Sequence, residues 1–167
     1  ICVMSHNRNL LFSTALLTII IWQQSVSNIY AKDESKAAEK QFAYGVGLYR
    51  DGLYELALPQ FGKYLVNWSE GDRAPQALYL SGECHFHLKA WRSCLENLSR
   101  LVDLYPFDPL ADAALLRSAQ AYLNDDKQER SIVVLERLIE EHPESKILPD
   151  ARYWSGEAAL AAGDTAL

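Results

Sequence analysis

The segment that decides the fold is Ala77-Leu-Tyr-Leu-Ser-Gly-Glu83, because two similar segments follow it along the chain. The second is Ala114-Leu-Leu-Arg-Ser-Ala-Gln120 and the third is Ala151-Arg-Tyr-Trp-Ser-Gly-Glu157, so successive copies start 37 residues apart. A repeat at a fixed interval of this size indicates a solenoid, in which similar units stack on one another. The same interval carries Gly82 back onto Gly45, which predicts four units, the last incomplete.

Within each unit the apolar residues have helical spacing. In the second helices of units two and three, the matching apolar positions are Leu95, Leu98, Leu101 and Val102, then Ile132, Leu135, Leu138 and Ile139. The pattern predicts paired helices near residues 34–50, 53–67, 73–88, 91–104, 108–123, 127–141 and 147–162. The fold class is therefore an all-α solenoid of antiparallel helix pairs.

Prolines support these boundaries. Pro75, Pro109 and Pro149 lie where first helices should begin, and Asp108 is a candidate N-cap. Pro59 lies about one turn into a second helix, where we expect it to be tolerated.

The N-terminus is expected to be a signal peptide. Arg8 precedes an apolar run over residues 10–22, which is short for a membrane span and is followed by a polar stretch. Met4 is the expected start, and cleavage is expected after Ala31, with Ser27 as the alternative site. An uncleaved N-terminal anchor is the other interpretation, whereas a lipid anchor is disfavoured because no cysteine closely follows the apolar run.

Residues 32–167 are expected to form one solenoid of three full repeats and the first helix of a fourth, truncated at the C-terminus. Arg8 is the only charged residue before Lys32, so removing the signal peptide changes the net charge from −6 to −7. Lysines and arginines are scattered singly among acidic residues, which argues against binding to nucleic acid or to an anionic membrane surface.

Unit one carries the pattern Gly45-x-x-Leu48-x-x-x-Gly52-x-Tyr54-x-x-Ala57-x-x-x-Phe61-x-x-Tyr64, which resembles the tetratricopeptide repeat. With the apparent export signal, the chain resembles tetratricopeptide proteins of the bacterial envelope. It is most similar to the periplasmic coordinator of the Tol-Pal system (CpoB type) and, more distantly, to outer-membrane assembly lipoproteins of the BamD type. The coordinators carry a coiled coil before the repeats and the lipoproteins a lipidated cysteine, and the sequence departs from both patterns.

This resemblance implies a concave groove lined by first helices, which would hold a protein or peptide partner. The positions that contact partners in such proteins correspond here to Phe42, Val46, Tyr49, Arg50, Tyr79, Glu83, Phe86, His87, Leu116, Gln120, Leu123, Asn124, Tyr153 and Glu157. Periodicity alone leaves open whether each aromatic side chain lies in the groove or in the core.

The sequence offers little support for catalysis. Cys84, His85, His87 and Cys94 have poor spacing for a zinc site, and we expect the cysteines to pack in the core, with a Cys84–Cys94 disulfide as an open alternative. Acidic pairs such as Asp125 and Asp126 are expected to be solvated, and the common nucleophile and phosphate-loop motifs are absent from the sequence. No metal, cofactor, small-molecule substrate or catalytic residue is therefore expected.

The leading hypothesis is an exported, periplasmic adaptor that binds another envelope protein. The alternative is that the repeats form the helical arm of a larger envelope enzyme, such as a cell-wall transglycosylase, whose catalytic domain lies beyond Leu167.

Overall fold

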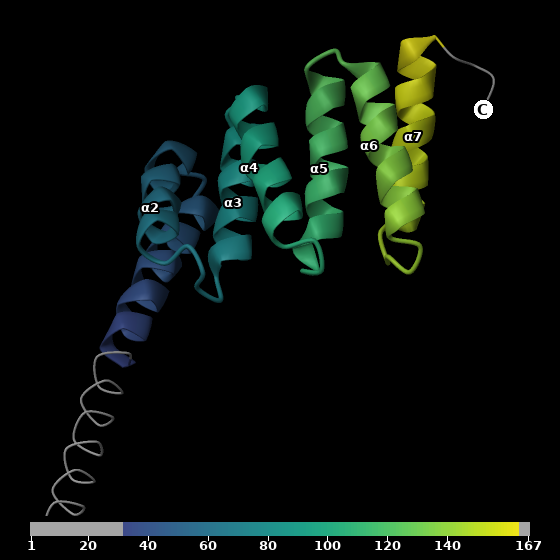
Figure 1. Cartoon of the computed structure of the whole chain (residues 1–167). Helices are drawn as coiled ribbons and strands as arrows, with labels where there is room; N and C mark the ends of the chain where they lie inside the picture. The colour runs from purple at the N-terminus through teal and green to yellow at the C-terminus, as the bar shows by residue number, and fades with distance from the viewer. Residues whose placement is uncertain (1–31, 164–167) are drawn as a thin grey trace, which may run out of the picture. The chain divides into compact units, whose positions relative to one another are not determined.

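The computed structural model describes residues 32–163, and these residues are helical apart from the turns between helices (Figure 1). An N-terminal helix includes residues 32–50. The helices that follow it in the described part are α2 (Tyr54–Asn67), α3 (Ala74–His87), α4 (Trp91–Leu104), α5 (Leu110–Asn124), α6 (Gln128–Glu141) and α7 (Leu148–Ala162). The predicted helix ends are confirmed to within two residues, and so is the all-α solenoid.

The chain divides into two compact units, residues 1–40 and residues 41–167. All the contacts discussed below lie in the second unit. The predicted signal peptide and both of its candidate cleavage sites fall outside the described residues. Within residues 32–163, every helix is too short or too polar to cross a membrane.

The turn after each first helix repeats the same backbone conformation. A residue with positive φ stands at intervals of 37 residues, with angles of 75°, 56°, 54° and 80° at Gly52, Lys89, Asp126 and Gly163. A left-handed residue of this kind commonly ends an α-helix. The period seen in the sequence is therefore also a period of the backbone.

In the first two helix pairs, a glycine of the first helix faces a bulky residue of the second helix. A Cβ atom on Gly45 would lie 2.8 Å from Cε1 of Phe61, and one on Gly82 would lie 2.7 Å from Cδ2 of Leu98. Phe61 and Leu98 are completely buried, so neither side chain has room to move away. The small residue therefore fixes how closely the two helices approach.

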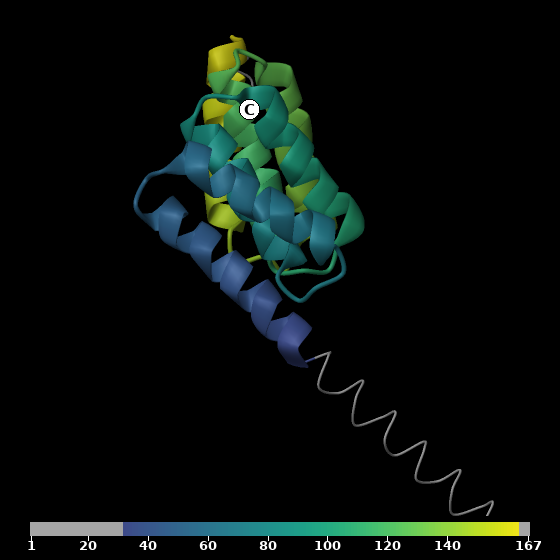
Figure 2. The ribbon, with the colours of Figure 1, turned by 90° about the vertical axis from the view of Figure 1, so that its left-hand side faces the viewer.

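The stacking of pairs is asymmetric. Successive helices contact each other, and the first helices also contact the next first helix, α3 with α5 and α5 with α7. Between Tyr54 and Ala162, no comparable contact joins α2 to α4 or α4 to α6. The second helices therefore lie further from one another than the first helices do. Figure 2 views the row of helices end on.

Helix starts agree with the proline positions, with one shift. Pro75 and Pro149 lie in the first turns of α3 and α7. Pro109 precedes α5, and the Asp108 carboxylate accepts a hydrogen bond of 2.8 Å from the Leu110 backbone N–H, so Asp108 caps the helix from one residue further out. Pro59 is exposed inside an unbroken α2.

The two cysteines lie in the core of the repeat. Cys84 and Cys94 are free and fully buried, which confirms core packing and makes the disulfide alternative wrong. Burial raises the pKa of each thiol to about 12, with the negative charge of Glu83 as the second cause. Both are therefore protonated hydrocarbon-like groups at neutral pH.

Ser131 stands at the position that Ala57 and Cys94 occupy in the two preceding units. All three side chains are completely buried. The Ser131 hydroxyl has no hydrogen-bond partner in the described structure, whereas the hydroxyl of Ser118 donates to the Ala114 carbonyl at 2.7 Å. An unpaired buried hydroxyl is unfavourable, because it loses its hydrogen bonds to water on folding.

We predict that Ser131→Ala raises the free energy of unfolding by about 1 kcal/mol, because it removes this unpaired hydroxyl and leaves almost no cavity. Ser118→Ala is the matched control, and it should change stability much less because it also removes a satisfied bond. Urea denaturation of the three proteins measures the difference. Equal stability of the two variants would mean that Ser131 has a partner in solution.

We predict that Gly82→Ala lowers the free energy of unfolding by about 1–3 kcal/mol, because the added methyl group overlaps the immobile Leu98 side chain. Gly62→Ala is the control: it also lies within a helix, but its Cβ would meet nothing within 4 Å. That change should stabilise the protein by up to about 1 kcal/mol through helix propensity. Thermal melts followed by circular dichroism compare both with the parent chain, and a neutral Gly82→Ala would contradict the close approach.

Candidate partner-binding face

Aromatic rings from three helices meet at one end of the first helices. His87 of α3 stacks on Tyr54 of α2, with ring centroids 4.4 Å apart and planes inclined by 3°. Tyr49 of the N-terminal helix lies beside both, at 5.7 Å from Tyr54 and 6.4 Å from His87. Burial, followed by the negative charge of Glu83, raises the pKa of Tyr49. The structure thus brings Tyr49 and His87, both predicted to contact a partner, together around the ring of Tyr54, which was not predicted to do so.

A buried ion pair joins the first helices α3 and α5. Nε of Arg117 lies 2.5 Å from Oε1 of Glu83, and its Nη2 donates to Oε2 at 3.1 Å. The Glu83 side chain is only 6% exposed and the Arg117 side chain 29% exposed. Two parallel hydrogen bonds of this kind fix both distance and orientation, so the pair sets the position of α5 on α3.

Arg117 gathers other predicted residues around it. Its Nη1 donates a hydrogen bond of 2.8 Å to Oε1 of Gln120, and its guanidinium lies over the Phe86 ring at 4.6 Å from the centroid. Such stacking adds cation–π attraction to the ion pair. Glu83, Phe86 and Gln120 therefore belong to one cluster centred on Arg117.

The Tyr79 phenol lies beside this ion pair, and both of its charges act on the Tyr79 pKa. Burial, followed by the charge of Glu83, raises the pKa of Tyr79 to about 12, so its hydroxyl stays neutral. Burial, the largest single cause, lowers the pKa of Arg117, but the charge and hydrogen bond of Glu83 together with the effects of Tyr79 outweigh it, so the pKa is raised. At physiological pH the cluster therefore contains a neutral Tyr79 phenol beside the positively charged Arg117 guanidinium.

Other predicted groove residues lie apart from this cluster. Phe42 is 7% exposed and packs on Phe61 and Tyr64 of α2, at 6.0 and 5.7 Å, so its ring is part of the core. Leu116 packs against the core, and Val46 and Leu123 are half-buried. The exposed predicted residues are Arg50, His87, Asn124, Tyr153 and Glu157.

Two central residues, Arg117 and Tyr54, were missed as site residues. Arg117 does not fall on the offsets implied by the tetratricopeptide resemblance. The sequence does single out Arg117. The same repeat position holds Leu80 in unit two and Trp154 in unit four, so of these three residues only Arg117 is charged. Tyr54 was recognised only as a repeat residue.

The side chains exposed on this face are suited to binding a protein partner. Its exposed residues combine an aromatic ring, an imidazole, an amide and charges of both signs on helices that are locked together. Aromatic anchors beside a few polar groups are typical of surfaces that bind proteins.

Comparison with known proteins agrees with this description. The family described as YfiO, outer membrane lipoprotein, matches residues 71–167. No curated protein matches the chain. A solved structure from Podosopora anserina, a point variant of a protein described as a kinesin light chain with nearly identical TPR-like repeats, is similar with a TM-score of 0.65. It is 11% identical, and the similarity covers 77% of this chain and 68% of that one.

The structural similarity confirms the tetratricopeptide-like fold, and at this identity it shows the fold alone. The family match confirms the resemblance to outer-membrane lipoproteins of the BamD type, while the resemblance to the Tol-Pal coordinator stays a prediction. Because the match extends over more than half of the sequence, the chain belongs to the YfiO family of outer membrane lipoproteins.

Proposed function

We propose that this protein is a non-catalytic scaffold of the bacterial envelope, and that it holds a segment of another envelope protein on the face formed by its first helices. The repeat fold and the family match support an interaction scaffold in general. The observation that carries the specific proposal is the Arg117 cluster, which joins the residues of two successive first helices into one surface.

The side chains of the first-helix face are held in place before a partner binds. A partner that binds mobile side chains must order them, and this ordering weakens binding. Here Glu83 and Arg117 hold α3 against α5, and the stack of Tyr54 and His87 fixes one end of the face. The exposed groups are therefore displayed on a surface that is already ordered before the partner arrives.

The proposed location is the periplasmic side of the envelope, reached through the predicted signal peptide. The description of the family as outer membrane lipoproteins supports it. Cys84 and Cys94 are fully buried, so neither can carry a lipid in the folded protein.

Site-specific photo-crosslinking tests the face. A photoreactive residue at His87 or Asn124, both exposed on first helices, should form an adduct with one and the same envelope protein. The same residue at Lys63, which is exposed on the second helix α2, is the control. We predict adducts from the first two positions and none from the third. Equal adducts from all three, or none from the first two, would contradict binding at this face.

The ion pair itself predicts a stability effect. Glu83→Gln leaves the half-buried Arg117 charge without its partner, and we expect it to lower the free energy of unfolding by about 2 kcal/mol. Glu157→Gln, at the same repeat position but exposed, should change stability by less than about 0.5 kcal/mol.

A double-mutant cycle with Arg117→Gln completes the measurement. The double variant should be more stable than the sum of the two single effects allows, because it leaves neither charge buried alone. Strict additivity in urea denaturation would show that Glu83 and Arg117 are not coupled.

A further inference from the structure

A hollow lies between the second helices α4 and α6. Its volume is about 670 Å³, and α4, α5 and α6 all line it. α4 and α6 do not contact each other, so α5 forms the floor between them. The deepest lining residues are Val102, Leu115 and Ser118, all buried.

This hollow continues in both directions along α6. A hollow of about 270 Å³ shares Tyr122, Arg130 and Val134 with it, and another of about 450 Å³ shares Val102 and Arg137. We give the name α4/α6 trough to the central hollow of about 670 Å³, because its two extensions are lined by the further acids Glu129, Asp108, Asp112 and Glu141. The α4/α6 trough follows α6 from Arg130 to Arg137, which is about 11 Å, so it matches about three residues of extended chain.

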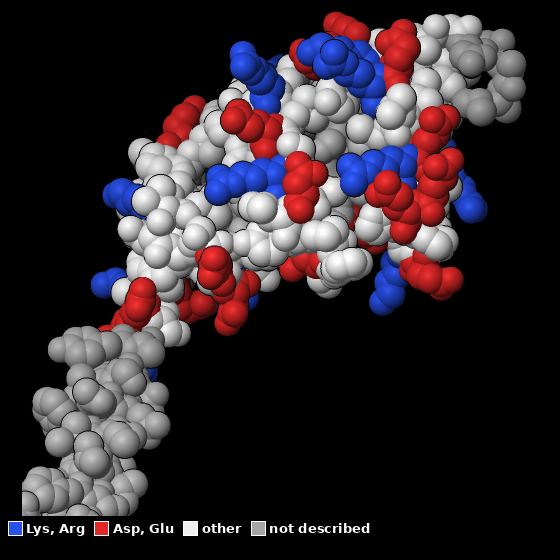
Figure 3. All heavy atoms as spheres, in the orientation of Figure 1, with Lys and Arg blue, Asp and Glu red and all other residues white. Residues whose placement is uncertain are grey.

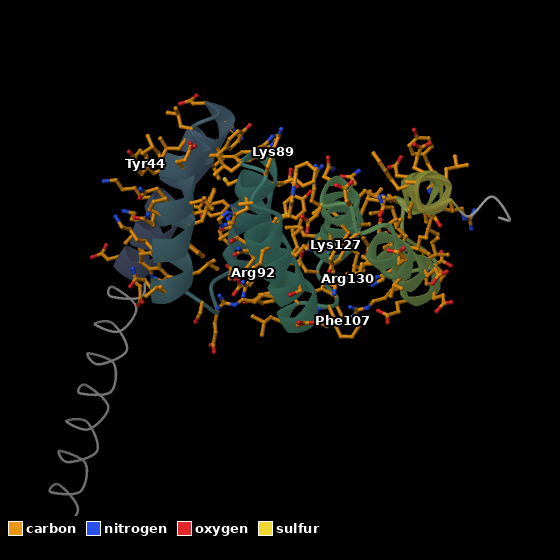
Figure 4. The ribbon with its side chains drawn as sticks, turned by 90° about the horizontal axis from the view of Figure 1, so that it is seen from above. Tyr44, Lys89, Arg92, Phe107, Lys127 and Arg130 are labelled. Carbon is orange, nitrogen blue, oxygen red and sulfur yellow. The ribbon has the colours of Figure 1, made fainter. Side chains whose placement is uncertain are left out.

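The trough is richer in positive charge than the chain as a whole. Four cations line this central hollow, Arg92, Lys127, Arg130 and Arg137, against the two acids Glu96 and Asp125. The net charge of the whole chain is −6. In Figure 4, which is seen from above, Arg92, Lys127 and Arg130 are labelled along one side of the row of helices, and Lys89 on the other side.

Two of these cations are free to meet a ligand. Lys127 pairs with Asp125, and Nε of Arg137 lies 2.8 Å from Oε2 of Glu141. Arg92 and Arg130 have no ion pair or side-chain hydrogen bond within residues 32–163. Figure 3 shows positive and negative atoms interspersed over the surface seen in the orientation of Figure 1.

The preceding unit provides an internal comparison. The equivalent hollow, between α2 and α4 on a floor of α3, has a volume of about 340 Å³. Its Arg100 corresponds to Arg137, one period later. The positions that correspond to the trough residues Arg92, Lys127 and Arg130 are Glu55, Ala90 and Ser93. The repeat therefore supplies the hollow in both places, but only the α4/α6 trough has acquired these three cations.

We propose that the α4/α6 trough binds an extended acidic segment of a protein partner. Two carboxylates of this segment pair with Arg92 and Arg130, whose planar guanidinium groups suit bidentate carboxylate binding. Apolar side chains between the carboxylates rest on Leu95, Val102 and Val134. The negative charge of the rest of the chain repels the same segment elsewhere and favours this one position. The trough involves second helices, so this site is distinct from the first-helix face.

The test uses the full chain and an array of labelled hexapeptides. Two acidic residues are fixed at varied spacing, and the other positions are drawn from Leu, Val, Phe and Ser. A second array replaces the acidic residues by lysine. Fluorescence anisotropy should show binding to members of the acidic array, weakening as salt rises, and none to the lysine array. Arg92→Glu/Arg130→Glu should weaken the best acidic peptide at least 10-fold, about 1.4 kcal/mol.

Controls separate this site from its surroundings. Arg100→Glu, in the equivalent hollow of the preceding unit, and His87→Ala, on the first-helix face, should each leave peptide affinity within about twofold of the parent. Circular dichroism checks folding, and Arg92→Gln/Arg130→Gln provides a second, milder variant that should also weaken binding. Failure of adducts at His87 would leave these measurements unaffected, so the two proposals fail independently.

Three results would overturn the proposal. The first is no binding to any acidic peptide. The second is unchanged affinity in both double variants. The third is equal or tighter binding of a single-stranded oligonucleotide of the same charge, which would show that the trough recognises phosphate chains instead of acidic protein segments.

Discussion

The close approach of each first helix to its second helix is the constraint on which the rest of this structure depends. Gly45 and Gly82 have no room for a side chain against Phe61 and Leu98. Because the two helices of a pair are so close, they form a flat unit that buries only part of its apolar surface. The remainder must be covered by the next pair, so the units stack into a solenoid, and from α3 to α7 they share one hydrophobic core.

The way in which the pairs stack gives the protein two different surfaces. First helices contact one another, and the ion pair of Glu83 and Arg117 spans the contact of α3 with α5, with a buried carboxylate on α3 and a half-buried guanidinium on α5. Second helices lie further apart, and the spaces between them become hollows floored by first helices. The surface of the first helices is thus continuous, whereas the surface of the second helices is interrupted by one hollow between α2 and α4 and another between α4 and α6.

Much of the fold could be predicted because the repeat presents the same evidence several times. A single Gly or Tyr is weak evidence, but Ala77, Ala114 and Ala151 at equal intervals identify one structural position. Which predicted groove residues are exposed could not be predicted, because burial at one repeat position differs among units: Glu83 is buried in an ion pair and Glu157 is exposed. The trough could not be predicted, because it depends on the separation of α4 from α6, which no local pattern encodes.

The units therefore share one backbone conformation and differ in the side chains at a few equivalent positions. The left-handed turn residues recur at the same interval from Gly52 to Gly163, so the backbone frame is the same in each unit. Within that frame, Arg117 replaces an apolar residue on one surface, and Arg92 and Arg130 replace an acid and a serine on the other. The repeat sets the backbone conformation of each unit, whereas these differences between units change the charge of the surface. The choice of partner must then follow from the few positions where the repeats differ.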